Sequence, residues 1–178
     1  MLRALLFLLA AVAANAAPIA LRDSDDKAHT PLAAQDAKAT VLIFLAHDCP
    51  VANAMAPELA RIAAEYSKRG AKFFAVYALG TAAEITTHRR EYHLHFPGLL
   101  DPKCQLARHA GATRVPEAAV FSPTGKLLYR GRINDRAVKL GTMKPSATRH
   151  DLRDALEAIL SGKPAPAFTN AVGCYLPL

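Results

Sequence analysis

Apolar residues follow two different rhythms near the start of the chain. Residues 41–46 (VLIFLA) are apolar without interruption and have the length of a strand. Such a run predicts a strand buried on both faces of a parallel sheet. From residue 55 onward, apolar side chains recur at helical spacing and predict one buried stripe on a helix. The residues of this stripe are Met55, Leu59, Ile62, Ala63 and Tyr66. A buried strand should therefore lead into a long amphipathic helix.

The alternation of strand and helix continues along the chain. Residues 71–79 predict a second buried strand, because they are rich in residues that favour strands. Thr81 and Glu84 have the spacing of a capping box, so a helix should run from residue 82 to about residue 92. The next expected elements are a short strand at 96–100 and a helix at 103–109 that Gly111 ends. Strands that alternate with helices predict βαβ units and a mainly parallel sheet.

The pattern changes in the last third of the sequence. Residues 117–121 and 126–133 predict the two strands of a hairpin around a turn that contains Pro and Gly. Residues 134–146 are polar and basic and predict a loop. Thr148 should N-cap a final amphipathic helix, and a Pro-containing tail follows it.

The N-terminal sequence has the features of a secretory signal peptide. A short basic start precedes an apolar stretch, and Ala14-Asn15-Ala16 gives the small residues of a cleavage site. We therefore predict a signal peptide at 1–16, a single domain at 17–162 and a C-terminal tail at 163–178. The mature protein should be periplasmic or secreted, without a transmembrane segment.

The charge of the chain argues against one class of partner. The sequence contains 22 Lys and Arg against 15 Asp and Glu, a net charge of +7. Its late positive residues are typical of a solvated face. No basic stretch is interleaved with aromatic residues as in nucleic-acid-binding motifs, so we expect no nucleic-acid partner. The sequence makes no prediction of the oligomeric state.

Cysteine content and position suggest chemistry. The chain has three cysteines, Cys49, Cys104 and Cys174. An odd number in an exported protein leaves at least one thiol free, bound to metal or paired outside the chain. Cys49 should lie at the N-terminus of a helix, where unpaired amides favour a thiolate. We expect an activated cysteine on the exposed rim of the sheet rather than a buried apolar residue.

Several residues also resemble the thioredoxin-like superfamily, in particular its redoxin branch. They are Cys49-Pro50 at the junction of strand and helix, Pro57 inside the helix, and Val115-Pro116 before the hairpin. The branch includes alkyl hydroperoxide reductase and thiol-specific antioxidant proteins. The sequence also resembles Sco-type copper chaperones, more distantly.

The resemblance implies an α/β protein of thioredoxin-like fold. Helices should flank a central mixed β-sheet, and a hairpin and a helix should follow towards the C-terminus. It further implies that Pro116 is a cis-proline close to the catalytic Cys49.

The local motifs of three related activities are incomplete in this sequence. A C-x-x-C reductase motif would need a cysteine at Ala52, and a Sco-type C-x-x-x-C motif would need one at Asn53. The peroxiredoxin pattern P-x-x-x-T-x-x-C is broken by Leu42 and Ala46. Any mechanism that uses Cys49 therefore needs a second cysteine distant in sequence.

One hypothesis is a thiol-dependent oxidoreductase. Cys49 would be the nucleophile, and Cys174, or alternatively Cys104, would resolve it. The partner would be a small peroxide or a protein thiol or disulfide, and no cofactor would be needed. The residues expected around the thiolate are His47, Asp48, Pro50 and Arg132.

Two other hypotheses remain open from the sequence. Cys49, Cys174 and His47, with Cys104 as a further ligand, could bind Cu(I) or Zn in a protein of Sco-like type. Alternatively, the chain is a non-catalytic binding module of thioredoxin-like fold, and its cysteines form only a structural disulfide.

Overall fold

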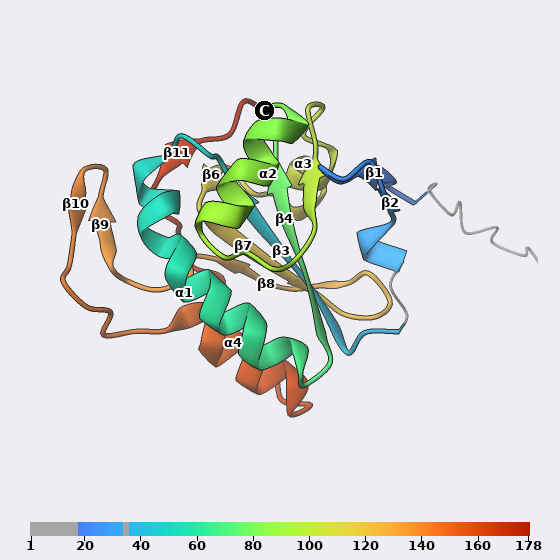
Figure 1. The fold of residues 1–178 in the computed structure, drawn as a ribbon. Coiled ribbons are helices and arrows are strands. Elements are labelled where there is room, and N and C mark those ends of the chain that lie inside the picture. The colour runs from blue at the N-terminus through green and yellow to red at the C-terminus, as the bar shows by residue number, and fades with distance from the viewer. Residues whose placement is uncertain (1–17, 34–35) are drawn as a thin grey trace, which may run out of the picture.

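A five-stranded mixed sheet forms the centre of the computed structural model, which describes residues 18–33 and 36–178 (Figure 1). The strands lie in the order β5-β4-β3-β7-β8. Their bounds are Ala39–Leu45 for β3, Ala71–Tyr77 for β4, Gly98–Leu100 for β5, Glu117–Phe121 for β7 and Leu127–Gly131 for β8. The predicted signal peptide lies outside the described residues.

The apolar run at residues 41–46 forms the centre of the sheet, as predicted. All seven residues of β3 are buried. β3 pairs in parallel with β4 and antiparallel with β7, so both of its edges are satisfied. The mixed sheet confirms the predicted fold class.

Four α-helices flank the sheet in the described part of the chain. They are α1 (Pro50–Ser67), α2 (Ala82–Glu91), α3 (Gln105–Ala110) and α4 (Asp151–Leu160). The strand order steps from β3 to β4 to β5 in one direction, and right-handed crossovers then place α1 and α2 on the same face. Figure 1 shows both helices in front of the sheet. α4 packs beside α1, because Arg153 of α4 contacts Glu58 of α1 at 2.8 Å.

Short elements complete the chain. β1 (Leu21–Arg22) pairs with β2 (Ala28–His29), and a 3-10 turn, η1 (Pro31–Ala33), follows them. β9 (Ala137–Lys139) and β10 (Thr142–Met143) form a ribbon, and β6 (Arg114–Val115) pairs with β11 (Cys174–Tyr175).

Two predictions about the segment after β8 were wrong. The expected polar loop at 134–146 contains the β9–β10 ribbon. The expected N-cap, Thr148, instead donates its backbone N–H to the carboxylate of Asp135 at 2.8 Å, and α4 begins three residues later. Asp135 is buried, and a buried carboxylate that lacks hydrogen-bond donors is destabilising. The hydrogen bond from Thr148 to Asp135 therefore replaces the expected capping interaction.

The described part of the chain contains no helix that is both long and apolar enough to span a bilayer.

Candidate active site

Cys49 is the N-cap residue of α1, directly after the loop that leaves β3. Pro50 occupies the first turn, as predicted. The Cys49 sulfur therefore lies at the positive end of an 18-residue helix. Contrary to the expected exposed rim, the residue is only 2% exposed. The burial follows from the segments that converge on it, and the Cys49 thiol donates to the Val115 carbonyl at 3.5 Å.

The peptide bond between Val115 and Pro116 is cis, as the resemblance implied. It joins β6 to β7, and β7 is the antiparallel neighbour of β3. The contact between Cys49 and Val115 places this loop against the start of α1. Cys49 and Pro116, distant in sequence, thus belong to one site.

Cys174 supplies the second sulfur of this site. Its Sγ lies 2.6 Å from the Sγ of Cys49, beyond the disulfide bond length of about 2.05 Å, and both thiols are free. Burial, followed by the contact with Cys49, raises the pKa of Cys174 to about 11. The structure thus brings together the two cysteines that the first hypothesis paired.

The tail that carries Cys174 contains a docked strand, β11. β11 pairs antiparallel with β6, and Cys174 lies opposite Val115 in this register. Figure 1 shows β11 beside β6 and the first turn of α1. Gly173 permits this approach, because a Cβ atom there would lie 1.9 Å from the Val115 carbonyl oxygen. The Arg114 guanidinium stacks over the Tyr175 ring at 3.4 Å.

Cys104 lies beside the end of the same tail. The residue is buried, and its thiol donates to the Pro177 carbonyl at 3.5 Å. Burial, with the negative charge of Asp101, raises the pKa of this thiol. Cys104 therefore contacts the tail three residues beyond Cys174, whereas Cys174 itself occupies the position against Cys49.

His47 and Asp48 were expected beside the Cys49 thiolate, and the structure gives each of them a different environment. The His47 ring lies against Gly80 and lines a hollow of about 310 Å³ that faces α2. The charge of Asp48 contributes to the raised pKa of Cys174, so it disfavours a thiolate there. In the chain as described, no three His, Cys, Asp or Glu side chains gather as metal ligands, and the predicted set of Cys49, Cys174 and His47 is not assembled.

The sequence profile of the AhpC/TSA family matches residues 12–130. The chain belongs to the AhpC/TSA family. This redoxin is therefore a member of the thioredoxin-like superfamily, and family and fold together support the predicted class of thiol-dependent oxidoreductase. The matched region contains Cys49 and Cys104 but ends before Cys174. Among curated proteins, no relative was found.

Solved structures similar to the redoxin share its fold. An uncharacterized conserved protein from Geobacillus kaustophilus is 26% identical, with a TM-score of 0.79 over 91% of this chain and 89% of that chain. The exposed lipoprotein thioredoxin Etrx1 of Streptococcus pneumoniae is 25% identical, with a TM-score of 0.54 over 64% of this chain and 87% of that chain. A secreted Mycobacterium tuberculosis disulfide oxidoreductase homologous to E. coli DsbE is 18% identical, with a TM-score of 0.57 over 82% and 96%.

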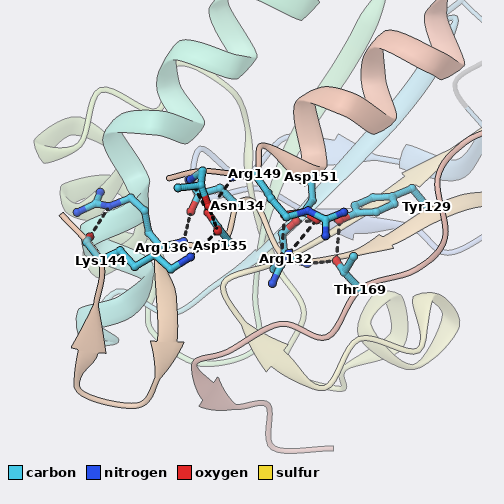
Figure 2. Close-up of polar contacts among 10 residues, drawn as sticks. Tyr129, Arg132, Asn134, Asp135, Arg136, Lys144, Arg149, Asp151 and Thr169 are labelled. Carbon is cyan, nitrogen blue, oxygen red and sulfur yellow. Dashed lines mark hydrogen bonds and ion pairs between the residues drawn. The ribbon is translucent and has the colours of Figure 1, made fainter. Parts of the chain in front are cut away.

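Arg132 of the redoxin has a structural partner in place of the expected thiolate. Its guanidinium donates to both carboxylate oxygens of Asp151, at 2.8 and 3.1 Å (Figure 2). This bidentate pair ties the end of β8 to the first turn of α4. Within the described residues, Arg132 makes no hydrogen bond to Cys49 or Cys174. The hydrogen bonds of the Arg132 guanidinium thus go to Asp151, and they lend no support to the predicted role at the thiolate.

A buried hydrogen-bond relay fixes the loop before Cys49, and no sequence pattern predicts it. The Tyr77 hydroxyl donates to Nδ1 of His88 at 2.8 Å, and Nε2 of His88 donates to Oδ1 of Asn53 at 3.0 Å. Asn53 then donates to the His47 carbonyl at 3.1 Å. Burial lowers the pKa of His88 to about 4, and the neutral ring suits both partners, with Nδ1 accepting from Tyr77 and Nε2 donating to Asn53.

Proposed function

We propose that the protein is an exported thiol–disulfide oxidoreductase that works through a reversible disulfide between Cys49 and Cys174. The observation that carries this proposal is the 2.6 Å separation of the two sulfurs. The pairing of β11 with β6 sets that separation, because Cys174 lies opposite the residue whose carbonyl contacts Cys49. A disulfide can form here without rearrangement of the central sheet.

The exchange is a two-electron reaction. The reduced protein and a partner disulfide yield the Cys49–Cys174 disulfide and two partner thiols, and the reverse reaction oxidises two partner thiols. Both directions pass through a mixed disulfide between the protein and the partner. No cofactor is needed, because the two sulfurs store both electrons.

A protein thiol or disulfide fits this site better than a peroxide does. The position that would supply a threonine hydroxyl beside the reactive cysteine is Ala46, so the side chain that would hold a peroxide oxygen is missing there. The similar structures from Mycobacterium tuberculosis and Streptococcus pneumoniae are described as a disulfide oxidoreductase and a thioredoxin. These descriptions support disulfide exchange as the activity.

Export places the reaction where disulfides persist. The signal sequence at residues 1–16 supports this, and the similar Mycobacterium tuberculosis protein is described as secreted. Expression of the full chain in a bacterium should yield a periplasmic protein that begins at Ala17. Intact-mass measurement of the periplasmic fraction tests this, and retention of residues 1–16 would contradict it.

The activity is tested with three serine variants of the mature protein. Exchange with a fluorescent peptide disulfide should fall by about 100-fold in Cys49→Ser and in Cys174→Ser, because either change prevents the disulfide. Cys104→Ser is the matched control and should stay within about twofold. Non-reducing peptide mapping should find Cys49 linked to Cys174 in the oxidised protein.

The competing hypotheses give different results in the same set of proteins. A disulfide between Cys49 and Cys104, or unchanged exchange in Cys174→Ser, would contradict the proposal. Stoichiometric uptake of Cu(I) or Zn by the reduced protein, without disulfide exchange, would favour the metal-binding hypothesis. If the protein shows neither disulfide exchange nor metal uptake, the result would favour the binding-module hypothesis.

A further inference from the structure

The two sulfurs of the proposed disulfide differ in how closely a partner can approach them. Cys49 is 2% exposed, and its sulfur is covered by Cys174 and the Val115 carbonyl. Cys174 is half-buried and reaches the surface, where it lines two hollows. A thiol on a protein or peptide therefore meets Cys174 before it can reach Cys49.

Apolar side chains line both hollows beside Cys174, and Arg114 and Lys139 also line the second. The first hollow, of about 510 Å³, is lined by Pro50, Val51, Leu140, Gly141, Met143 and Cys174. The second, of about 420 Å³, shares Leu140 and Cys174 and includes Val138 and Tyr175. Val138, Leu140 and Tyr175 are exposed. Exposed apolar residues that cluster on a surface are typical of a binding site.

The wall of the first hollow is held in place by a polar cluster at the base of the β9–β10 ribbon. The Asp135 carboxylate accepts from the Lys144 ammonium at 2.6 Å, and the Arg136 backbone N–H donates to Asn134 at 3.0 Å (Figure 2). The Arg136 guanidinium also donates to the Ala54 carbonyl of α1 at 3.5 Å. These contacts fix the ribbon, and with it Leu140 and Met143, relative to the start of α1.

We propose that the partner thiol enters at Cys174, where the mixed disulfide forms, and that the partner is a peptide or protein cysteine flanked by apolar side chains. The proposal rests on the proposed function and specifies its order of events. The partner thiolate attacks the Cys174 sulfur, the Cys49–Cys174 bond breaks, and Cys49 leaves as a thiolate with the electron pair. A second partner thiolate then attacks the sulfur of the first partner cysteine, which yields the partner disulfide and releases the Cys174 thiolate. That thiolate takes up a proton.

The chemistry of the leaving group favours the same order. Attack on Cys174 releases Cys49, whose sulfur lies at the positive end of α1, where a thiolate is stabilised. Attack on Cys49 would instead release Cys174, whose burial and whose nearby Asp48 charge both raise its pKa. A thiol of higher pKa leaves more slowly. Exposure and leaving-group stability therefore select the same sulfur.

The entry point can be trapped and mapped. The oxidised Cys104→Ser protein is mixed with an excess of a short peptide that has one cysteine between Phe and Leu. N-ethylmaleimide is then added at successive times to alkylate the sulfur that has been released. Mass spectrometry should find the peptide on Cys174 and the alkyl group on Cys49.

The opposite labelling would overturn the inference while leaving the proposed function intact. In that case the peptide would be attached to Cys49 and the alkyl group to Cys174. If neither cysteine gains the peptide and the protein disulfide persists, the protein does not exchange disulfides, and the proposed function fails together with the inference.

The apolar hollows are tested by the rate of the same reaction. The Phe-Cys-Leu peptide should form the adduct about fivefold faster than a Ser-Cys-Gly peptide, because its apolar neighbours can be buried beside Cys174. Leu140→Ser should remove most of this preference. Leu140 is 64% exposed, so the variant should fold. Phe168→Ser changes a residue that is 50% exposed outside the hollows, and it should retain the preference. Equal rates for the two peptides would overturn the apolar assignment.

Discussion

The two sulfurs of the site are held by regions that differ greatly in stability. Cys49 joins β3, whose seven residues are all buried, to an 18-residue helix that packs on the sheet. Cys174 belongs to a two-residue strand whose one partner among the described residues is β6, itself two residues long. Local opening requires the least free energy where few buried contacts are lost. Detachment of the tail should therefore require much less free energy than movement of the start of α1.

This difference suits disulfide exchange. A fixed Cys49 keeps one sulfur at the helix terminus, whereas a detachable Cys174 can accept a partner and return. The stability of the β11–β6 pairing then sets the effective concentration of Cys174 at Cys49. Changes to the central sheet and changes to the tail should consequently have separable effects, on global unfolding and on disulfide formation respectively.

The largest expected effect tests the stable region. Phe44 is the next-to-last residue of β3 and is fully buried. Phe44→Ala should lower the free energy of unfolding by about 3–5 kcal/mol, because it removes apolar contacts and leaves a cavity. Urea denaturation of the reduced protein measures this. Val138→Ala, at an exposed site, should change the value by less than about 0.5 kcal/mol. Similar losses in the two variants would contradict the contrast in packing.

The next effect tests the tail. Gly173→Val should undock β11, because even the Cβ atom would lie 1.9 Å from the Val115 carbonyl oxygen. Formation of the Cys49–Cys174 disulfide in a glutathione buffer should slow by at least about tenfold, the consequence of losing about 1.4 kcal/mol of docking free energy. The free energy of unfolding of the reduced protein should change by less than about 1 kcal/mol. Ala171→Val, in the same segment, is the matched control, and an equal slowing there would contradict the role of Gly173.

The same contrast explains which parts of the site the sequence predicts. The junction of β3 and α1 follows from a local apolar pattern, and Thr81 and Glu84 form the predicted capping box. The cis bond at Pro116 followed from the family resemblance. These features depend on short segments, or on motifs that families share.

The remaining features depend on contacts between distant segments. The burial of Cys49 results from a tail 125 residues later in the chain. Arg132 is bound by Asp151 and His88 by Asn53, and no periodicity reveals either partner. Gly173 is the local feature that fits the docked tail, because a glycine next to a cysteine permits close approach of two backbones.

A smaller effect concerns the relay that fixes the loop before Cys49. It should make the stability of the protein depend on pH. His88 is neutral in the relay, and its pKa of about 4 lies below the unfolded value of 6.5. Between these values the unfolded state binds more protons, so the stability contributed by neutral His88 is complete above pH 6.5 and is lost as the pH falls towards 4. The loss between pH 7 and pH 4 should be on the order of 1 kcal/mol.

Thermal unfolding between pH 7 and pH 4 measures this contribution. His88→Gln retains an uncharged amide in the relay and should reduce the slope of stability against pH. His150→Gln, which changes the N-cap residue of α4, is the histidine control and should leave the slope nearly unchanged. An unchanged slope in His88→Gln would show that the relay does not depend on the neutral form of His88.

The smallest effect concerns the stacking of Arg114 over Tyr175. The two groups are 3.4 Å apart, but Tyr175 is 76% exposed, so the interaction should contribute only about 0.5–1 kcal/mol to docking of the tail. Tyr175→Ala should therefore lower the effective concentration of Cys174 at Cys49 by about two- to fivefold, measured from the equilibrium of the disulfide with glutathione. Tyr175→Phe retains an aromatic face and should stay close to the wild type. If the Phe variant falls as far as the Ala variant, the ring face does not hold the tail. The backbone pairing of β11 with β6 would then supply the docking free energy of the tail. The difference in stability between the two regions would in that case come from their strand pairing and not from side-chain stacking.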